Sequence, residues 1–169
     1  MTSGQTAWSL RNDHDLLTPS EGRPLSVEEP SHRRAEFTPR PEPAWRVTAE
    51  EVLALIGLPD AVLADAREPA QYTNAVRRGP RGGHIPGAVS APRELCIDDA
   101  GNFKSDHDLR TALEDAGLRP EQRIVAYCNG GVAATTLLFS MSLLGYPALA
   151  NYDGSWNEWS NRPELPVEG

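Results

Sequence analysis

A single cysteine, Cys128, is the residue in this sequence best placed to do chemistry. It occurs in the stretch YCNGGVAAT, Tyr127 to Thr135, where two glycines and other small residues follow it. Glycine adopts backbone conformations that other residues avoid, so successive N–H groups of this loop can turn towards the sulfur. A helix that begins directly after the loop would add its positive end. Both effects favour the thiolate, which is the nucleophilic form of cysteine.

Two other interpretations of Cys128 start from the same residues. A free cysteine is often a small buried hydrophobic residue with no chemical role. A phosphatase also places a cysteine in a loop before a helix, but it needs an arginine at the end of that loop to hold phosphate oxygens. Residues 132–136 contain no arginine, which disfavours a phosphatase. The other cysteine, Cys96, has no glycine loop or helix start beside it and is predicted to be structural.

The segments around Cys128 predict short strands that alternate with helices. Strands are expected at 61–65, within 84–92, at 123–127 and within 148–155, and helices at 48–57, 105–117 and 132–145. This order predicts an α/β fold with three layers, in which helices cover both faces of a central, mainly parallel sheet. Ligands bind at the carboxyl ends of the strands in such sheets, and Cys128 directly follows a predicted strand.

The chain is predicted to hold one folded domain, at 45–169, after an extended or flexible arm at 1–44. The arm is rich in proline, serine, glutamate and arginine, and it carries too little apolar surface to offset the entropy lost on ordering. A formal net charge of -8 argues against nucleic acid and anionic membranes as partners. The sequence has no recognisable export signal and no apolar stretch of membrane-spanning length, so a cytoplasmic protein is expected.

Five segments resemble the rhodanese (sulfurtransferase) family, in the order in which that family has them. They are LADAREPAQY, RGGHIPGAVSAP, GNFKS, YCNGGVAAT and NYDGSWNEW, and the similarity covers about residues 46–169. The greatest similarity is to the C-terminal, catalytic half of the tandem thiosulfate and 3-mercaptopyruvate sulfurtransferases. The resemblance therefore implies a rhodanese-like domain at 45–169.

This resemblance also implies a reaction. The Cys128 thiolate takes a sulfane sulfur from thiosulfate or 3-mercaptopyruvate, and the resulting persulfide passes it to cyanide or a thiol. No cofactor and no metal are required. The residues expected to bind substrate or the persulfide anion through backbone amides are Asn129, Gly130, Gly131, Val132 and Ala133.

The sulfur donor is left open by the residues beside Cys128. Thiosulfate-type members carry basic side chains in the loop, whereas Asn129 and Gly130 are neutral. The mercaptopyruvate type usually has a serine in place of Gly130 and an arginine in place of Gln71. Arginine suits a carboxylate or sulfonate, and the candidates are Arg67, Arg77, Arg78 and Arg81. Arg67, Gln71 and Arg81 are predicted to bind substrate, with Arg67 the best placed.

Four further residues lie in the resembling motifs and are expected to support the site rather than react: Asp65, His84, Asp153 and Trp156. Two alternatives to a sulfurtransferase with small donors remain. One is a persulfide carrier or redox-linked binding module that receives sulfur from a protein donor. The other is an inactive homologue, which the intact Cys128 loop disfavours. The N-terminal domain of the tandem enzymes has no counterpart here, so we expect a homodimer or a partner domain in trans.

Overall fold

The computed structural model describes residues 34–40 and 42–169 of the 169-residue chain. Residues 34–40 are exposed and have no regular secondary structure. Most of the arm predicted at 1–44, namely residues 1–33 and 41, lies outside the described residues. The folded unit begins at Arg40, and its first regular element is a short 3-10 helix, η2, Pro43–Trp45. Among the described residues, no helix has the length and apolar character needed to cross a bilayer.

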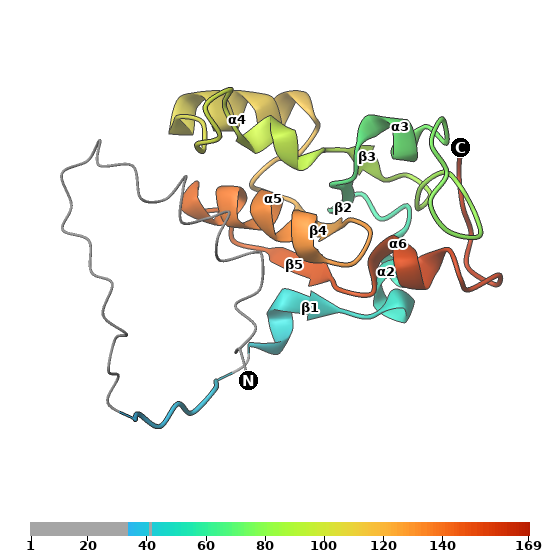
Figure 1. Ribbon diagram of the computed structural model, residues 1–169, viewed down its shortest axis with the longest axis horizontal. Helices are drawn as coiled ribbons and strands as arrows, with labels where there is room; N and C mark the ends of the chain where they lie inside the picture. The colour runs from blue at the N-terminus through green and yellow to red at the C-terminus, as the bar shows by residue number, and fades with distance from the viewer. Residues whose placement is uncertain (1–33, 41) are drawn as a thin grey trace, which may run out of the picture. The chain divides into compact units, whose positions relative to one another are not determined.

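Five parallel strands form the central sheet (Figure 1). In chain order they are β1 Arg46–Val47, β2 Ala61–Asp65, β3 Val89–Ser90, β4 Arg123–Tyr127 and β5 Leu149–Tyr152. Their spatial order is β1-β5-β4-β2-β3, which puts β4 at the centre. Asp65 pairs with Tyr127 where β2 and β4 end. The chain that leaves β4 therefore starts beside the chain that leaves β2.

Helices cover both faces of the sheet, which confirms the predicted three-layer α/β arrangement. On one face, α4 (Asp106–Asp115), α5 (Val132–Leu143) and the 3-10 helix η3 (Arg93–Cys96) pack on apolar side chains of β2 and β4. On the other, α2 (Ala49–Leu55) and α6 (Ser155–Trp159) enclose a second core that contains Trp156 and Trp159. A single turn, α3 (Pro69–Tyr72), follows β2.

Local sequence explains where the helices begin. Thr48 and Glu51 form a reciprocal capping box at the start of α2, and the Ser105 hydroxyl accepts the Asp108 N–H at the start of α4. The helix after the cysteine loop, α5, starts at a residue without a side chain, Gly131, whose φ is 80°. A left-handed backbone of this kind favours glycine.

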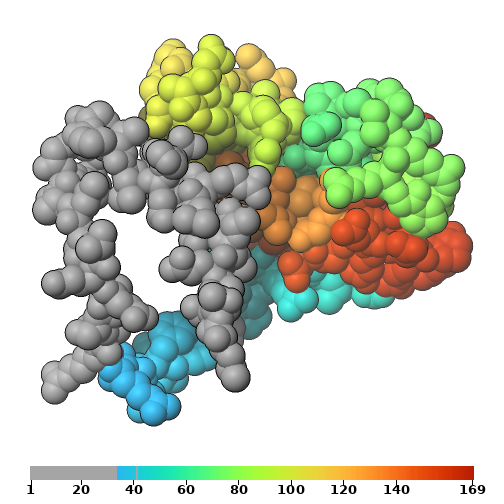
Figure 2. All heavy atoms as spheres, in the orientation of Figure 1, coloured from blue at the N-terminus to red at the C-terminus, as the bar shows by residue number. Residues whose placement is uncertain are grey.

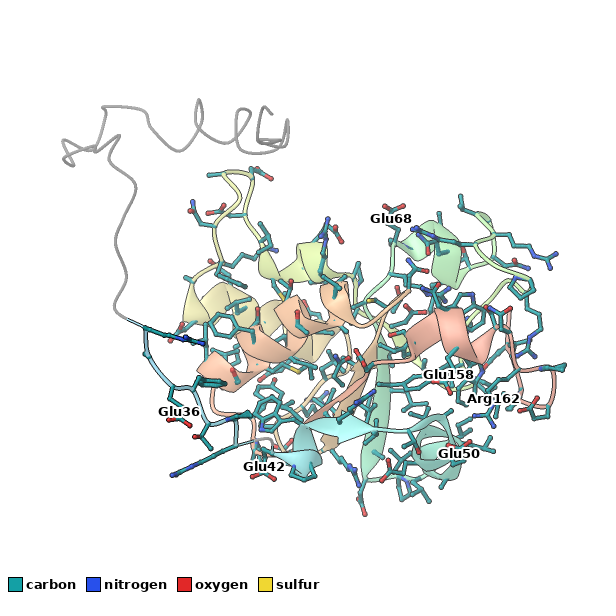
Figure 3. All side chains as sticks on the ribbon, turned by 60° about the horizontal axis from the view of Figure 1, so that its bottom comes forward. Glu36, Glu42, Glu50, Glu68, Glu158 and Arg162 are labelled. Atoms are coloured by element: carbon teal, nitrogen blue, oxygen red, sulfur yellow. The ribbon has the colours of Figure 1, made fainter. Side chains whose placement is uncertain are left out.

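The C-terminal segment closes over the loop that follows α3. Figure 2 shows the green residues of this loop beside the red residues of the C-terminal segment. The Arg81 guanidinium donates to four carbonyls of that segment, at 2.6 to 3.1 Å. Further along, Glu168 forms an antiparallel bridge with His84. Arg162 links α6 to α2 by ion pairs with Glu158 and Glu50, the three residues labelled together in Figure 3.

Candidate active site

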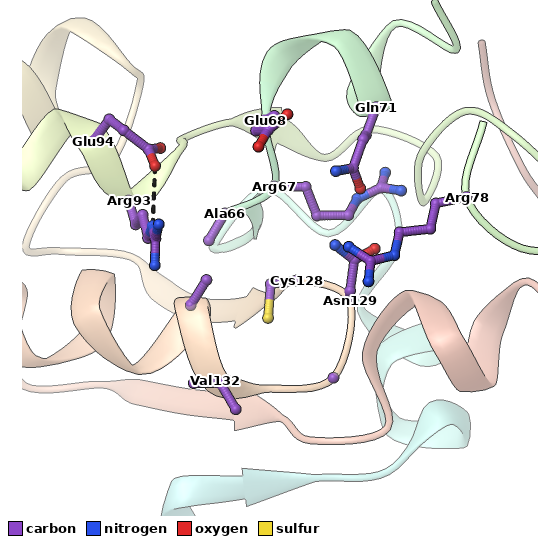
Figure 4. A pocket seen from close by; sticks show the side chains of 12 residues that line it. Ala66, Arg67, Glu68, Gln71, Arg78, Arg93, Glu94, Cys128, Asn129 and Val132 are labelled. Atoms are coloured by element: carbon purple, nitrogen blue, oxygen red, sulfur yellow. Dashed lines mark hydrogen bonds and ion pairs between the residues drawn. The ribbon is translucent and has the colours of Figure 1, made fainter. Parts of the chain in front are cut away.

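Cys128 lies on the wall of a cavity of about 310 Å³ at the carboxyl end of β4 (Figure 4). The residue is 4% exposed, and its neighbours Asn129 and Gly130 also line the cavity. The complete lining is Ala66, Arg67, Glu68, Gln71, Arg78, Arg93, Glu94, Cys128, Asn129, Gly130, Val132 and Ala133. The thiol is thus shielded by protein on most sides but faces a space large enough for a small molecule.

The loop after Cys128 is held by a buried hydroxyl that the sequence did not single out. Ser155 Oγ accepts the N–H groups of Cys128 and Gly131, at 3.1 and 2.9 Å, and donates to the Tyr152 carbonyl at 2.8 Å. The N–H of Gly131, which was expected to face the sulfur, is therefore bound elsewhere. Within the described part of the chain, the N–H groups of Asn129, Gly130, Val132 and Ala133 have no hydrogen-bond partner, so they remain free to bind an anion.

Two more main-chain bonds fix the same loop. The Trp156 N–H donates to the Cys128 carbonyl and the Asn157 N–H to the Asn129 carbonyl, both at 3.0 Å. Ser155 itself adopts a φ of 53°, which is unusual for a residue with a side chain. Its signal in the sequence was only a hydroxyl residue after the predicted Asp153–Gly154 turn. The start of α6 thus determines the shape of the cysteine loop.

Removing the Ser155 hydroxyl should disorder this loop. In Ser155→Ala two buried N–H groups lose their acceptor, at a cost of about 1–3 kcal/mol each. We expect the rate of Cys128 alkylation by iodoacetamide to fall roughly tenfold, since the sulfur loses its fixed position. Ser155→Gly should show the same fall, because glycine tolerates the backbone conformation but also lacks the hydroxyl. An alanine variant that reacts like the parent would show that Ser155 does not position the loop.

Gly131 is required by a close approach as well as by its conformation. A Cβ at this position would stand 2.8 Å from Asp153 Oδ1 and 3.2 Å from the Asp153 carbonyl. Asp153 therefore lies directly against the loop, and it forms an exposed ion pair with Arg46 at 3.2 Å. Gly130 is less constrained, since a Cβ there would meet only the Asn157 amide at 3.3 Å.

A buried ion pair forms the floor of the site. The Asp65 carboxylate accepts from Arg67 Nε and Nη2, the shortest contact being 2.6 Å, and the two side chains are 0% and 1% exposed. The Arg67 guanidinium also donates to the Gly83 carbonyl at 2.7 Å and lies 4.3 Å from the centre of the Trp156 ring. Arg67, which was predicted to bind substrate, lines the cavity, but its charge is already balanced by Asp65.

The Tyr127 hydroxyl completes this network. It donates to Asp65 Oδ2 at 2.8 Å and accepts the Ile85 N–H at 3.1 Å. Burial, with a further contribution from the Asp65 charge, raises the pKa of Tyr127 well above its usual range. The phenol therefore stays protonated and remains a donor to the carboxylate. His84, from the same region, stacks on Tyr72 with ring centres 3.8 Å apart.

The structure does not bring Arg81 to the cavity. Its guanidinium is held by the carbonyls of Trp159, Ser160, Arg162 and Leu165, so the predicted substrate-binding role gives way to a structural one. Arg78, three residues earlier, lines the cavity in its place. The lining also includes Glu68, from the start of α3, and Arg93 and Glu94, from η3. The sequence did not predict these residues, because they lie far from Cys128 along the chain.

Two amide side chains of the site have oxygens without partners. Gln71, which is 7% exposed, and Asn129 both line the cavity. Within the described residues, Gln71 Oε1 and Asn129 Oδ1 have no hydrogen-bond donor. Among residues 34–40 and 42–169, no three His, Cys, Asp or Glu side chains come together in a way that would hold a metal ion. Cys96 is fully buried away from the cavity, and burial raises the pKa of its thiol.

Comparison with known proteins places most of the folded unit in one family. The model of the rhodanese-like domain matches residues 48–162. A thiosulfate sulfurtransferase of Azotobacter vinelandii is 30% identical over 168 residues, which cover 99% of this chain and 58% of the relative. The sulfur carrier protein TtuD of Thermus thermophilus is 34% identical over 160 residues, covering 87% of this chain and 56% of the relative. The chain thus spans somewhat more than half the length of these relatives.

Solved structures of similar fold include variants of EanB and an ergothioneine biosynthesis enzyme. A variant of EanB in complex with ergothioneine is 27% identical, with a TM-score of 0.78 over 88% of this chain and 38% of EanB. A variant of EanB with a cysteine persulfide, in a tetrahedral intermediate state with ergothioneine, is 26% identical with a TM-score of 0.77. The anaerobic ergothioneine biosynthesis enzyme of Chlorobium limicola, bound to trimethyl histidine, has a TM-score of 0.69 at 27% identity. This match covers 75% of this chain and 32% of the Chlorobium limicola enzyme.

Proposed function

This chain belongs to the rhodanese-like domain family, and from that premise we propose that it is a sulfurtransferase that works through a persulfide on Cys128. The observation that carries the proposal is the cysteine loop. Cys128 faces a cavity, and four neighbouring N–H groups of the described chain have no acceptor. Main-chain donors of this kind stabilise an anionic sulfur without a metal or a cofactor.

The proposed reaction has two steps. The Cys128 thiolate attacks the outer sulfur of thiosulfate, the bond from that sulfur to the sulfonate sulfur breaks, and sulfite leaves with the electron pair. With 3-mercaptopyruvate the carbon–sulfur bond breaks and pyruvate leaves after taking up a proton at carbon. Cyanide or a thiolate then attacks the outer sulfur of the persulfide and regenerates the Cys128 thiolate. The N–H groups of Asn129, Gly130, Val132 and Ala133 hold the charged sulfur between the steps.

A second candidate is a persulfide carrier that receives sulfur from a protein. One relative is named a sulfur carrier protein, and the loop residues Asn129 and Gly130 lack the basic side chains that would attract a small dianion. A carrier of this type would keep the Cys128 persulfide but would react poorly with small donors.

Intact mass measurement distinguishes the two candidates. The protein is incubated with thiosulfate or with 3-mercaptopyruvate, and the gain of one sulfur atom on Cys128 is measured before cyanide is added and thiocyanate is followed. Loading by a small donor and release to cyanide support the sulfurtransferase. Loading only by a cysteine desulfurase supports the carrier. No loading from any of these donors would contradict both.

We also propose that the domain works next to a second copy or a partner domain in trans. Apolar side chains on the outer side of α5 are exposed, among them Val132, Phe139 and Leu143, and Phe103 packs on Phe139 with ring centres 5.4 Å apart. Val132 also belongs to the cavity lining, so a partner on this side would lie near the site. Sedimentation equilibrium measures the assembly, and a monomer at high concentration would contradict the homodimer.

A further inference from the structure

We propose that the Cys128 cavity selects a sulfur donor with one negative charge, anchored by Arg78, and that Glu68 and Glu94 disfavour a dianion such as thiosulfate. The inference rests on the proposed function, because it concerns the donor of the same reaction. The inference is drawn from the charged side chains around the cavity, some of which form ion pairs with one another while others have no partner.

Three arginines line the cavity, and among the described residues Arg78 is the one that has no ion-pair partner. Arg67 is buried against Asp65, and Arg93 forms an ion pair with Glu94 at 2.9 Å. The guanidinium of Arg78 has no hydrogen bond or ion pair with the described residues, and Figure 4 shows it beside Asn129. Its backbone is fixed, since the Arg78 carbonyl accepts the Trp156 indole N–H at 3.1 Å. Arg78 is therefore a well-placed cation for the anionic end of a donor.

Two carboxylates oppose this cation. Glu68 and Glu94 line the same cavity and are exposed. In the described part of the chain Glu68 has no ion pair, so no neighbouring cation offsets its charge. Together with Asp65 beneath Arg67, these carboxylates match the arginines of the site in number. The side-chain charges around the cavity therefore nearly cancel. The main-chain N–H groups beside Cys128 add hydrogen-bond donors but no net charge.

An electroneutral cavity discriminates between anions by their charge. Each fixed charge acts twice as strongly on a dianion as on a monoanion at the same place. A dianion also loses more hydration on entry, and here no net positive field compensates for that loss. 3-Mercaptopyruvate with a protonated thiol carries one charge, on a carboxylate that matches the fork of Arg78. We therefore expect a higher kcat/KM with 3-mercaptopyruvate than with thiosulfate.

The first test measures kcat/KM for both donors at one low ionic strength. The double variant Glu68→Gln, Glu94→Gln should raise the thiosulfate to 3-mercaptopyruvate ratio about threefold or more, because removing negative charge helps the dianion twice as much. Arg78→Gln should lower kcat/KM for both donors, and more steeply for thiosulfate. The controls are Glu121→Gln and Arg119→Gln, exposed residues before β4, at the opposite end of the strands. Arg119→Gln changes the net charge by as much as Arg78→Gln does, and Glu121→Gln by as much as each of the two glutamate substitutions. Both controls should leave the ratio unchanged.

The second test does not depend on sulfur transfer. Iodoacetate and iodoacetamide alkylate a thiolate in the same way but differ by one negative charge, so the ratio of their rates at Cys128 reports the local field. The ratio should rise in the Glu68, Glu94 double variant and fall in Arg78→Gln. Buried Cys96 does not compete, and digestion followed by mass spectrometry identifies the alkylated site.

The two tests separate the inference from the function on which it rests. If the alkylation ratio moves as described but neither donor loads Cys128, charge selection is supported and the assigned donors are wrong. If sulfur transfer occurs but both ratios stay within about twofold of the parent in every charge variant, the function stands and the inference is overturned. A parent protein that prefers thiosulfate would also overturn the inference.

Discussion

Cys128→Ser will lose sulfur transfer by more than about a thousandfold, because the sulfur that carries the persulfide is gone and a serine hydroxyl is not ionised near neutral pH. The variant should gain no sulfur atom in its intact mass with thiosulfate or 3-mercaptopyruvate, and thiocyanate should stay at the level of the reaction without protein. Its fold should be unchanged, since a serine hydroxyl is close in size to the thiol.

The matched control for this variant is Cys96→Ala. Cys96 is the other cysteine of the chain, it is fully buried in the core beneath α4 and α5, and it does not line the cavity. Cys96→Ala should keep persulfide formation and thiocyanate release near the parent level, with some loss of stability from the small void. Residual transfer in Cys128→Ser would show that Cys128 does not carry the persulfide. Loss of transfer in Cys96→Ala with the fold intact would show the same.

Asp65→Asn will lower the free energy of unfolding by about 3–5 kcal/mol, because it leaves the Arg67 guanidinium buried without its counter-charge. Both side chains of this pair are almost fully buried, so water cannot replace the lost carboxylate. The loss is a large part of the 5–15 kcal/mol that stabilises a typical domain. Urea unfolding followed by tryptophan fluorescence measures it, since Trp156 stacks on Arg67.

The exposed ion pair between Arg93 and Glu94 is the control for this effect. Its side chains are 59% and 60% exposed, and Glu94→Gln should change the unfolding free energy by less than about 1 kcal/mol. The double variant Asp65→Asn, Arg67→Met should recover much of the stability lost in the single variant, because no unpaired charge remains. If Asp65→Asn is no less stable than Glu94→Gln, the buried pair does not hold the floor of the site.

Much of the fold could be predicted from the sequence because its signals are local. The strands expected at 61–65 and 123–127 are β2 and β4, residue for residue, since both are short apolar runs between turn residues. The starts of α2 and α4 were predicted from their capping residues. The strand expected within 84–92 is shorter in the structure, where β3 is Val89–Ser90. The residues before it form a turn in which the Ala88 N–H donates to the Ile85 carbonyl.

The elements that the sequence missed are short and depend on distant partners. β1 has two residues and exists through its parallel pairing with β5. α3 and α6 are too short to show a helical period. The strand expected within 148–155 ends at Tyr152, and Ser155 begins α6 instead.

For the site, the sequence could not predict which arginine lines the cavity. Arg78 and Arg81 lie three residues apart in one basic loop, and sequence alone does not indicate which of them faces the cavity. The answer depends on four carbonyls that lie about eighty residues further along the chain and hold Arg81. Glu68 and Glu94 were missed for a similar reason, because their nearness to Cys128 comes from the packing of segments that are far apart in the sequence.

The bonds from Ser155 to the N–H groups of Cys128 and Gly131 span more than twenty residues of chain. During synthesis on the ribosome, Cys128 is therefore added to the chain before the hydroxyl that shapes its loop. A nascent or truncated chain that stops short of residue 155 would carry the thiol without its anion-binding cradle. Reactivity at this cysteine would then appear late in biogenesis, once the chain beyond β5 has emerged and folded onto the sheet.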